Sequence, residues 1–275
     1  MPGIARHFYF ERKFATIHRV KISAVIITFN EEQNIAEAIK SVSWADQILV
    51  VDSYSEDRTV EIAQLAGANV IAREWKGFAD QKQFATDAAA NDWVISLDAD
   101  ERVSSGLARE IQALNAEGRL AEVDGYSIPR LSIYMGREIR HSGWYPDRQL
   151  RLFDRRKCSW GSRVVHESVE MSPGSKTRVL AGNLFHYSIR NASEHGKLVT
   201  ERYAPLSARQ MFIDRRQTTK TRAGVAGMAA FIRTFILKAG FLDGFPGLCI
   251  AYFAAYNAFL KHLLLLEMQQ ASKNR

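Results

Sequence analysis

The chain has 275 residues, of which 47% are hydrophobic, and a formal net charge of +7. This length and apolar content suffice for a buried core and argue against disorder. Cys158 and Cys249 lie far apart and match neither a disulfide framework nor a paired-cysteine zinc site. The first twenty residues contain no apolar stretch of signal-peptide length. We therefore expect a reducing, cytoplasmic setting without an export signal.

Strands and helices are predicted to alternate over the first hundred residues. Short apolar runs predict strands at residues 23–29, 47–51, 69–72 and 93–97. Three helices are expected between these strands. The first follows Asn30, which is a suitable N-cap residue. The second covers residues 57–66 and is ended by Gly67, and the third covers residues 81–90. Such alternation implies a parallel sheet flanked by helices, with the ligand beyond the carboxyl ends of the strands.

The strongest chemical signal is Asp98-Ala99-Asp100, directly after the apolar run that ends at Leu97. Residues two apart on an extended segment point to the same side, so both carboxylates can face one divalent cation. Charged groups at the end of a buried strand also need a partner. The segment therefore predicts a metal site, with a solvated acidic turn as the alternative.

Polar residues also end the first two predicted strands. Their donors and acceptors suit a nucleotide base and ribose, although Asn30 and Ser55 are equally good helix caps. These residues are Thr28, Asn30 and Glu31 after the first strand, and Asp52, Ser53 and Ser55 after the second. No glycine-rich phosphate loop occurs, so we expect metal and cations such as Lys82 and Arg102 to hold a diphosphate.

Three segments carry a family resemblance. They are Ala-Val-Ile-Ile-Thr-Phe-Asn-Glu-Glu at 24–32, Leu-Val-Val-Asp-Ser-Tyr-Ser-Glu-Asp-Arg-Thr at 49–59 and Ser-Leu-Asp-Ala-Asp-Glu at 96–101. Together they resemble the family 2 glycosyltransferases of the GT-A fold. Four further segments are similar to bacterial lipopolysaccharide core glucosyltransferases: Tyr145 to Phe153, Val165-His166-Glu167, Phe185-His186-Tyr187-Ser188 and Gly240-Phe241-Leu242-Asp243-Gly244.

The resemblance implies inverting transfer from a nucleotide diphosphate sugar, in the first instance a UDP-hexose, with Mg²⁺ or Mn²⁺ as cofactor. By carry-over, Thr28, Asn30, Glu31 and Asp52 contact the nucleoside, and Asp98 and Asp100 hold the metal against the diphosphate. A carboxylate must take the proton of the acceptor hydroxyl. Glu167 is the first candidate. Asp147 is the second, although Pro146 replaces the carboxylate that the family places before it.

Several further side chains have two interpretations. His186 or His166 could complete the metal sphere or bind phosphate, or could be a hydrogen-bonded core residue. Arg148 and Arg151 could bind donor or acceptor phosphate, or form structural ion pairs. Trp144, Tyr145 and Trp160 could stack on sugars, or belong to the core.

The second half of the chain is basic and then apolar. Residues 130–163 contain nine Lys or Arg and three Asp or Glu. Residues 197–238 contain nine Lys or Arg and two Asp or Glu. Such a surface attracts polyanions, unless it is simply a solvated basic face. Residues 244–260 carry no formal charge, but Asn257 interrupts this run, and Lys261 and His262 follow it at once. We expect helices lying in the membrane interface, with a membrane span and a soluble dimer surface as alternatives.

These observations predict an α/β protein with the GT-A fold and a C-terminal helical appendage that associates with a membrane. The expected divisions are a basic arm at 1–21, a catalytic domain at 22–190 and the helical region at 191–275. Residues 22–105 would bind the nucleotide sugar and residues 106–190 the acceptor.

The expected activity is hexosyl transfer to a glycolipid or phosphorylated saccharide, such as lipopolysaccharide core, at the inner face of the cytoplasmic membrane. We expect an anionic membrane surface as a partner, and we do not expect nucleic acid to bind. Two alternatives are a haloacid-dehalogenase-like phosphohydrolase, which also places Asp-x-Asp after a buried strand, and a non-catalytic membrane-surface binding protein.

Overall fold

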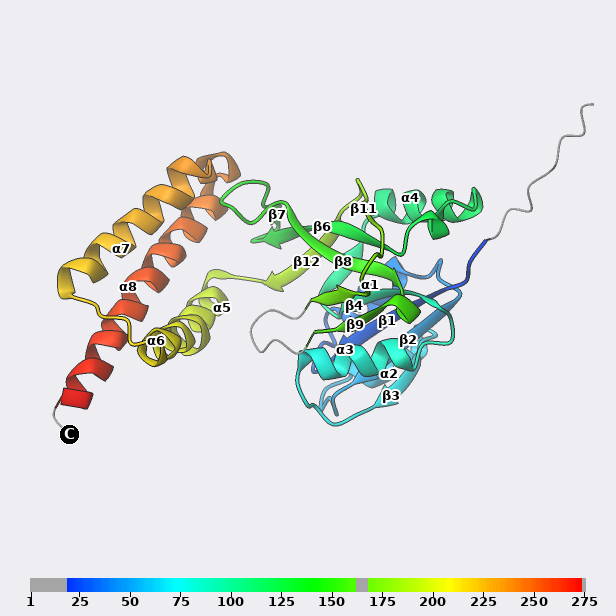
Figure 1. Ribbon diagram of the computed structural model, residues 1–275, viewed down its shortest axis with the longest axis horizontal. Helices are drawn as coiled ribbons and strands as arrows, with labels where there is room; N and C mark the ends of the chain where they lie inside the picture. The colour runs from blue at the N-terminus through cyan, green and yellow to red at the C-terminus, as the bar shows by residue number, and fades with distance from the viewer. Residues whose placement is uncertain (1–18, 162–167, 274–275) are drawn as a thin grey trace, which may run out of the picture.

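The computed structural model describes residues 19–161 and 168–273. Figure 1 shows two parts, a sheet packed between helices and a helical appendage beside it, formed by the chain after the last sheet strand. The predicted α/β architecture with a C-terminal helical appendage is confirmed.

One half of the main sheet is parallel and carries the predicted strand ends. Its strands, in the order β3-β2-β1-β4, are β1 (Ile22–Thr28), β2 (Gln47–Asp52), β3 (Asn69–Ala72) and β4 (Trp93–Asp98). They are connected by α1 (Ile35–Ser41), α2 (Thr59–Leu65) and α3 (Phe78–Asp87). In this register Thr28 lies opposite Asp52, and Ile27 lies opposite Asp98. The polar strand ends therefore meet at one edge.

Helices cover both faces of this half. Every residue of β1 is buried. On one face, Ile26 and Ile95 pack with Ile39 of α1 and with α2 and α4 (Ser105–Ala116). On the other face, Val25 and Val94 pack with Ala85 of α3. This two-sided burial explains why the strands are continuous apolar runs without alternation.

The prediction that Asn30 caps the first helix is wrong. Helix α1 begins at Ile35, and Asn34 precedes it without a capping side-chain hydrogen bond. Asn30 has φ of 53°, and its side-chain Oδ1 accepts from the N–H of Glu56 at 2.8 Å. Its own N–H donates to Ser55 Oγ at 2.8 Å, so Ser55 is not a helix cap either. Both side chains instead connect the loops that follow β1 and β2.

The second half of the sheet is mixed. Its strands are β5 (Glu101–Val103), β6 (Gly125–Tyr134), β7 (Arg137–Glu138), β8 (Asp147–Asp154), β11 (Thr177–Val179) and β12 (Leu184–Ile189), while β9 (Cys158–Trp160) and β10 (Val169–Met171) pair separately. Strand β8 runs antiparallel between β4 and β6. In this register Arg130 lies opposite Asp147, and Glu101 lies opposite His186. Residues from distant parts of the chain thus reach the end of β4.

The appendage is a set of packed helices. They are α5 (Ala192–Lys197), the π-helical η3 (Leu198–Tyr203), α6 (Ala204–Ile213), α7 (Lys220–Ile232), the π-helical η4 (Arg233–Leu237), the short η5 (Gly240–Asp243) and α8 (Phe245–Lys273). Helices α7 and α8 approach closely at Gly227, where a Cβ atom would lie 3.3 Å from the carbonyl oxygen of Ala255. A larger side chain there would push the two helices apart.

Asp243 connects the helical appendage to residues 140–142, which follow β7. Its buried carboxylate accepts from the backbone N–H groups of Arg140 and His141, at 3.1 and 3.2 Å, and from Ser142 Oγ at 2.8 Å. The N–H of Ser142 donates in turn to the carbonyl oxygen of Lys238 at 3.0 Å. These bonds satisfy a carboxylate that would otherwise be costly to bury.

A buried histidine lies beside this junction. His195 packs between Tyr134, Trp144 and Phe253, and its Nδ1 lies 3.2 Å from the Tyr134 hydroxyl. Burial lowers the pKa of His195 from 6.5 to about 4, because the site disfavours the charged ring.

Stability should therefore fall as the pH drops from 6.5 towards 4, because the unfolded chain binds a proton that folded His195 resists. At pH 5 the expected contribution is a loss of about 2 kcal/mol relative to pH 8. Urea unfolding of the wild type and of His195→Phe at both pH values measures it. The variant should show a smaller loss by about this amount, and equal losses would contradict the assignment.

Candidate active site

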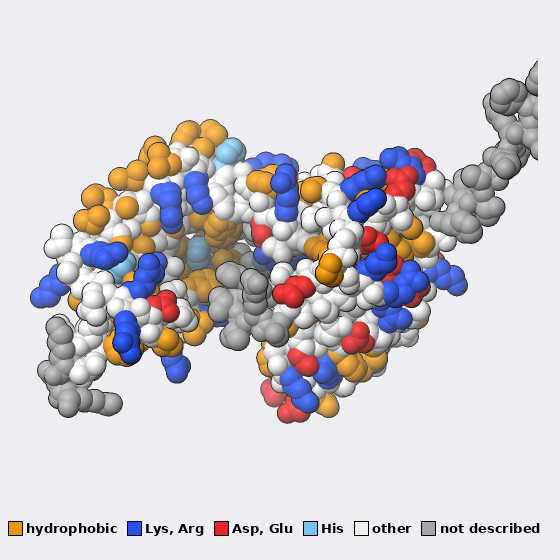
Figure 2. All heavy atoms as spheres, viewed as in Figure 1, with side chains coloured by type: hydrophobic (Ala, Val, Ile, Leu, Met, Phe, Trp, Pro, Cys, Tyr) orange, Lys and Arg blue, Asp and Glu red, His pale blue; other side chains and the backbone are white. Residues whose placement is uncertain are grey.

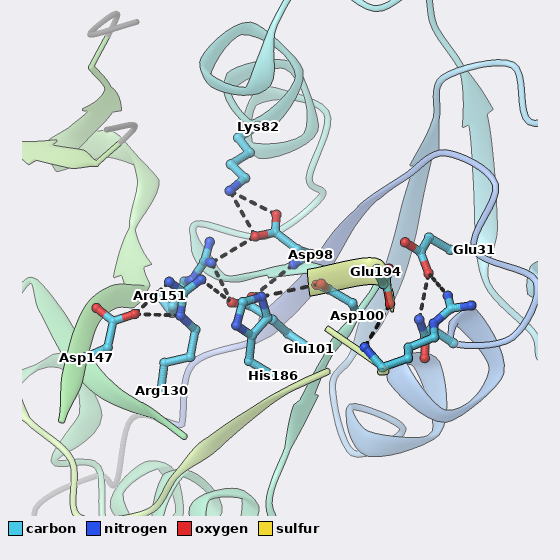
Figure 3. A network of polar contacts seen from close by, with 12 residues as sticks. Glu31, Lys82, Asp98, Asp100, Glu101, Arg130, Asp147, Arg151, His186 and Glu194 are labelled. Atoms are coloured by element: carbon cyan, nitrogen blue, oxygen red, sulfur yellow. Dashed lines mark hydrogen bonds and ion pairs between the residues drawn. The ribbon is translucent and has the colours of Figure 1, made fainter. Parts of the chain in front are cut away.

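The carboxylate of Asp98 is held between two cations at the end of β4. Lys82 Nζ, from α3, lies 2.9 Å from Asp98 Oδ1, and Arg151 Nη2, from β8, lies 3.1 Å from Oδ2. Figure 3 shows these three side chains converging from separate elements. The predicted donor-site residues Lys82, Asp98 and Arg151 are therefore brought together.

Glu101 lies at the centre of the network, and the sequence interpretation assigned it no role. It is fully buried. Its Oε1 accepts from Arg151 at 2.7 Å and from Arg130 at 3.3 Å, and its Oε2 accepts from the N–H of Asp98 at 3.0 Å. Glu101 thus orients both arginines and fixes the turn that carries Asp98. Its place directly after Asp98-Ala99-Asp100 was the one available signal.

The charges of this network stabilise one another. Burial alone would raise the pKa of Asp98, but the charges of Lys82 and Arg151 outweigh it, so the pKa lies well below its ordinary value. Burial opposes the charge of Arg151, yet Glu101 and Asp98 raise its pKa above the ordinary value. The site therefore keeps these groups ionised in a poorly hydrated place, where their fields act strongly.

Asp100 meets His186 of β12. Its Oδ2 lies 3.4 Å from His186 Nε2, and its carbonyl oxygen accepts from the N–H of Tyr187 at 2.9 Å. Both side chains are partly exposed. Strand β12 thus places His186 beside Asp100, in an arrangement that would allow His186 and Asp100 to bind one cation.

The residues around Asp100 suit a hard divalent cation only in part. Among residues 19–161 and 168–273 there is no group of three or more His, Cys, Asp or Glu side chains arranged to hold a metal. A carboxylate and an imidazole fit a cation that takes its other ligands from a diphosphate and water, as Mg²⁺ commonly does. The donor set therefore fits a metal held jointly by protein and substrate.

The residues predicted to contact the nucleoside line the edge next to this network. Thr28 is buried, and its Oγ1 has no hydrogen-bond partner among the described residues. Asp52, also buried, accepts from the N–H and Oγ of Ser55 at 2.8 and 2.5 Å. A buried hydroxyl without a partner at a sheet edge is costly unless a ligand or water binds it.

Glu31 and Arg190 form a second cluster at this edge. Burial raises the pKa of Glu31, the hydrogen bond from Asn34 lowers it and the charge of Asp100 raises it again, so that the pKa lies above its ordinary value. Arg190 Nη2 lies 3.5 Å from Glu31 Oε2, and its Nη1 donates to Gln33 at 2.7 Å. Arg190, which the sequence interpretation missed, links the start of the appendage to the loop after β1.

A cavity of about 520 Å³ opens beside Asp98. Its lining includes four cations, Lys82, Arg130, Arg148 and Arg151, together with Trp160. The ring centroid of Trp160 lies 5.2 Å from Lys82 Nζ, and its Nε1 donates to Thr86 Oγ1 at 3.1 Å. Such a cavity can take a sugar and anionic groups.

The other two aromatic candidates lie elsewhere. Trp144 packs against Tyr134 and His195 at the junction with the appendage, which supports the core interpretation. The hydroxyl of Tyr145 donates to Asn183 Oδ1 at 3.0 Å.

The two candidate bases differ in what the structure shows. Asp147 Oδ2 lies 2.6 Å from Arg130 Nη2, and its Oδ1 accepts from Gln149 at 2.7 Å. Through Arg130 it joins the network around Glu101. Glu167, the first candidate, lies outside the described residues, as does His166.

Comparisons with known proteins identify the family of the chain. The glycosyl transferase family 2 sequence model matches residues 23–177, more than half of the chain. An uncharacterized glycosyltransferase of Rickettsia typhi is 31% identical over 264 residues, which cover 92% of this chain and 89% of the relative. The lipopolysaccharide core biosynthesis glycosyltransferase LpsC of Rhizobium meliloti is 27% identical over 261 residues, which cover 90% of this chain and 95% of LpsC.

Among solved structures, the chain is similar to glucosyl-3-phosphoglycerate synthase from Mycobacterium tuberculosis in complex with Mn²⁺, UDP and glucosyl-3-phosphoglycerate. The identity is 25%, the match covers 42% of this chain and 45% of that one, and the TM-score is 0.34. The family match and the α/β sheet observed here confirm the expected GT-A fold. The chain belongs to glycosyl transferase family 2.

Proposed function

We propose that this glycosyltransferase moves a hexose, with inversion, from a nucleotide diphosphate sugar, in the first instance a UDP-hexose, to a cell-envelope glycolipid such as lipopolysaccharide core. The observation that carries the proposal is the pair of aspartates at the end of β4, one between Lys82 and Arg151 and the other beside His186. The similarity to LpsC, a lipopolysaccharide core biosynthesis glycosyltransferase, supports the acceptor class.

The nucleoside would lie against the edge formed by β1 and β2. Thr28 offers a buried hydroxyl there. Asn30, Glu31 and Asp52 lie next to it, at the ends of β1 and β2 and in the loops that follow them. Because Asn30 and Ser55 connect these two loops, the edge is preorganised for one ligand shape. Selection of the base would follow from this fixed geometry.

The diphosphate would lie between the two aspartates. Asp100 and His186 would hold Mg²⁺ or Mn²⁺, and Asp98 would keep Lys82 and Arg151 in place, since both of its oxygens already face cations. The metal, when bound, supplies positive charge against the leaving diphosphate. Lys82 and Arg151 contribute fixed charge from the protein itself, without reorganisation during the reaction.

The acceptor would enter from the side of the basic cavity. Inversion requires its hydroxyl oxygen to attack the anomeric carbon as the bond to the diphosphate breaks, while a carboxylate takes the hydroxyl proton. Glu167 and Asp147 are the candidates for this base. For Asp147 to act, one of its oxygens must exchange a hydrogen bond from Arg130 or Gln149 for one from the acceptor.

Membership of this family sets aside the phosphohydrolase alternative, which would use Asp98 as a nucleophile. The proposed place of action is the inner face of the cytoplasmic membrane, with the enzyme peripheral to an anionic lipid surface. The acceptor class and this location are consistent with one another, because a lipid-linked sugar is confined to a bilayer.

The decisive test is nucleotide release from a panel of UDP, GDP and CMP sugars, with and without Mn²⁺, in the presence of a membrane extract that contains acceptors. We expect metal-dependent release from one donor, with the hexose transferred to the glycolipid fraction. Release without transfer would contradict the acceptor. No release from any donor, while the protein remains folded, would contradict the catalytic proposal.

A further inference from the structure

The helical appendage exposes an unusual amount of apolar surface. Figure 2 shows hydrophobic side chains gathered along the outer edge of α7 and over the bend that leads to α8. We define the apolar face as Val225, Met228, Ile232, Ile236, Leu237, Phe241, Leu242, Phe245, Leu248, Tyr252, Phe259 and Leu263, all of which are exposed. An exposed surface of this kind marks an interaction site.

The residues of the apolar face follow helical spacing. On α7 and η4, Val225, Met228, Ile232 and Ile236 are three or four residues apart, so that they form one stripe. On α8, Phe245, Leu248, Tyr252, Phe259 and Leu263 form a second stripe by the same spacing. The exposed residues are thus arranged along two helices and do not occur at random.

The charges within the stretch that carries the apolar face are mostly positive, and the nearest acidic residues along the chain on either side of it are Asp214 and Glu267. Residues 215–266 contain seven Lys or Arg, and Asp243 is their single acidic residue. Asp243 is buried and occupied by the junction with the sheet. This stretch therefore presents no carboxylate to solvent. Arg222 and Arg233, eleven residues or three helical turns apart, lie on one side of the first stripe.

The bend between the helices is basic as well. The side chain of Lys238 lies against Gly143, and the Arg137 guanidinium lies against Gly244. Leu237, Phe241 and Phe245, which project from this bend, are among the more exposed apolar residues of the chain. Apolar side chains at an exposed bend with cations around them fit the boundary between lipid headgroups and acyl chains.

The same charges disfavour a second copy of the chain as the partner. A twofold dimer through this face would bring two surfaces of the same positive sign together, which costs free energy. An anionic bilayer, in contrast, offers both the apolar environment and the opposite charge. Helix α8 is long and apolar enough to cross a bilayer. It nevertheless packs against α6 and α7, and His262 is bound to Thr218 at 2.9 Å within that packing.

We infer that the apolar face docks on the surface of a bilayer that contains anionic lipids, with α7 and α8 lying in the interface. This inference names the surface behind the proposed membrane location, and it rests on that proposal for its biological role only. Docking itself requires neither donor nor acceptor.

Co-sedimentation of the full chain with vesicles tests the inference. We expect binding to vesicles of phosphatidylcholine mixed with phosphatidylglycerol, and binding at least roughly tenfold weaker to phosphatidylcholine alone. The double variant Leu237→Gln with Phe241→Gln should lose roughly tenfold in affinity for the mixed vesicles. Arg222→Gln with Arg233→Gln should lose about fivefold per side chain.

Matched controls lie on the catalytic domain. Leu65→Gln removes a residue as exposed as Leu237, and Lys76→Gln with Arg109→Gln removes two exposed charges. Both should bind vesicles as the wild type does, and circular dichroism should show all variants folded. Failure of the wild type to bind either vesicle, equal binding by the double variants, or a dimer that Leu237→Gln with Phe241→Gln dissociates would overturn the inference. Nucleotide release from the donor panel reports separately on the catalytic proposal.

Discussion

Replacing Glu101 with glutamine should lower the free energy of unfolding by about 3 to 5 kcal/mol. The side chain is fully buried and accepts hydrogen bonds from Arg151 and Arg130 and from the N–H of Asp98. Glutamine keeps the size but removes the charge, so the two arginines lose a buried partner and face each other's charge. Transfer activity should fall as well, because the same arginines hold the edge of the donor site.

Urea unfolding and activity assays on one preparation measure both effects. Glu117→Gln is the matched control, because Glu117 forms an exposed pair with Arg119, and such pairs contribute little. Its unfolding free energy should change by less than about 1 kcal/mol. If Glu101→Gln were as stable and as active as this control, the network could not be what holds the end of β4 in place.

Replacing Asp100 with asparagine should lower the metal-dependent rate of nucleotide release by roughly 10³-fold while leaving the fold intact. Asp100 is partly exposed, and His186 is the one charge partner found within 4 Å of it among the described residues. Its removal therefore costs little stability. The loss arises because the carboxylate charge that would hold the cation beside the diphosphate is absent.

Release rates measured over a series of Mn²⁺ concentrations distinguish this role from a structural one. Asp100→Asn should need much more Mn²⁺ for half-maximal rate, and His186→Ala should shift the same curve in the same direction. Asp80→Asn, which removes the exposed partner of Arg73, is the control and should follow the wild type. A lower rate at unchanged Mn²⁺ dependence would assign Asp100 to a role other than metal binding.

The sequence predicted the parallel half of the fold closely because each strand there is a continuous apolar run between helices. Asn69–Ala72 has the predicted bounds, β2 and β4 end one residue later than predicted, and β1 begins and ends one residue earlier. The edge that carries Thr28, Asp52 and Asp98 followed from parallel topology alone. Among the neighbouring strands, β5, β7, β9, β10 and β11 have three residues or fewer, and β8 and β12 pair with strands that are distant in sequence, so no local pattern revealed their register.

The sequence predicted which residues belong to the site better than it predicted which of them contact one another. Arg151 and His186 were candidates, but only the antiparallel placement of β8 and β12 shows that one meets Asp98 and the other meets Asp100. Glu101 was missed because a glutamate after an acidic pair looks solvated until the fold buries it. Asn30 was misinterpreted because its side-chain oxygen, which could cap a helix, accepts equally well from the N–H of Glu56, 26 residues away in a neighbouring loop.

Asp243 binds residues 140–142 through two backbone N–H groups and through the side chains of His141 and Ser142. Every residue except proline supplies the backbone donor, so half of this attachment depends on the path of the turn, and the other half depends on the side chains at 141 and 142. A substitution at residue 140 by any residue except proline would therefore leave its bond to Asp243 in place, whereas a substitution of Ser142 by a residue without a hydroxyl would remove the shortest of these bonds.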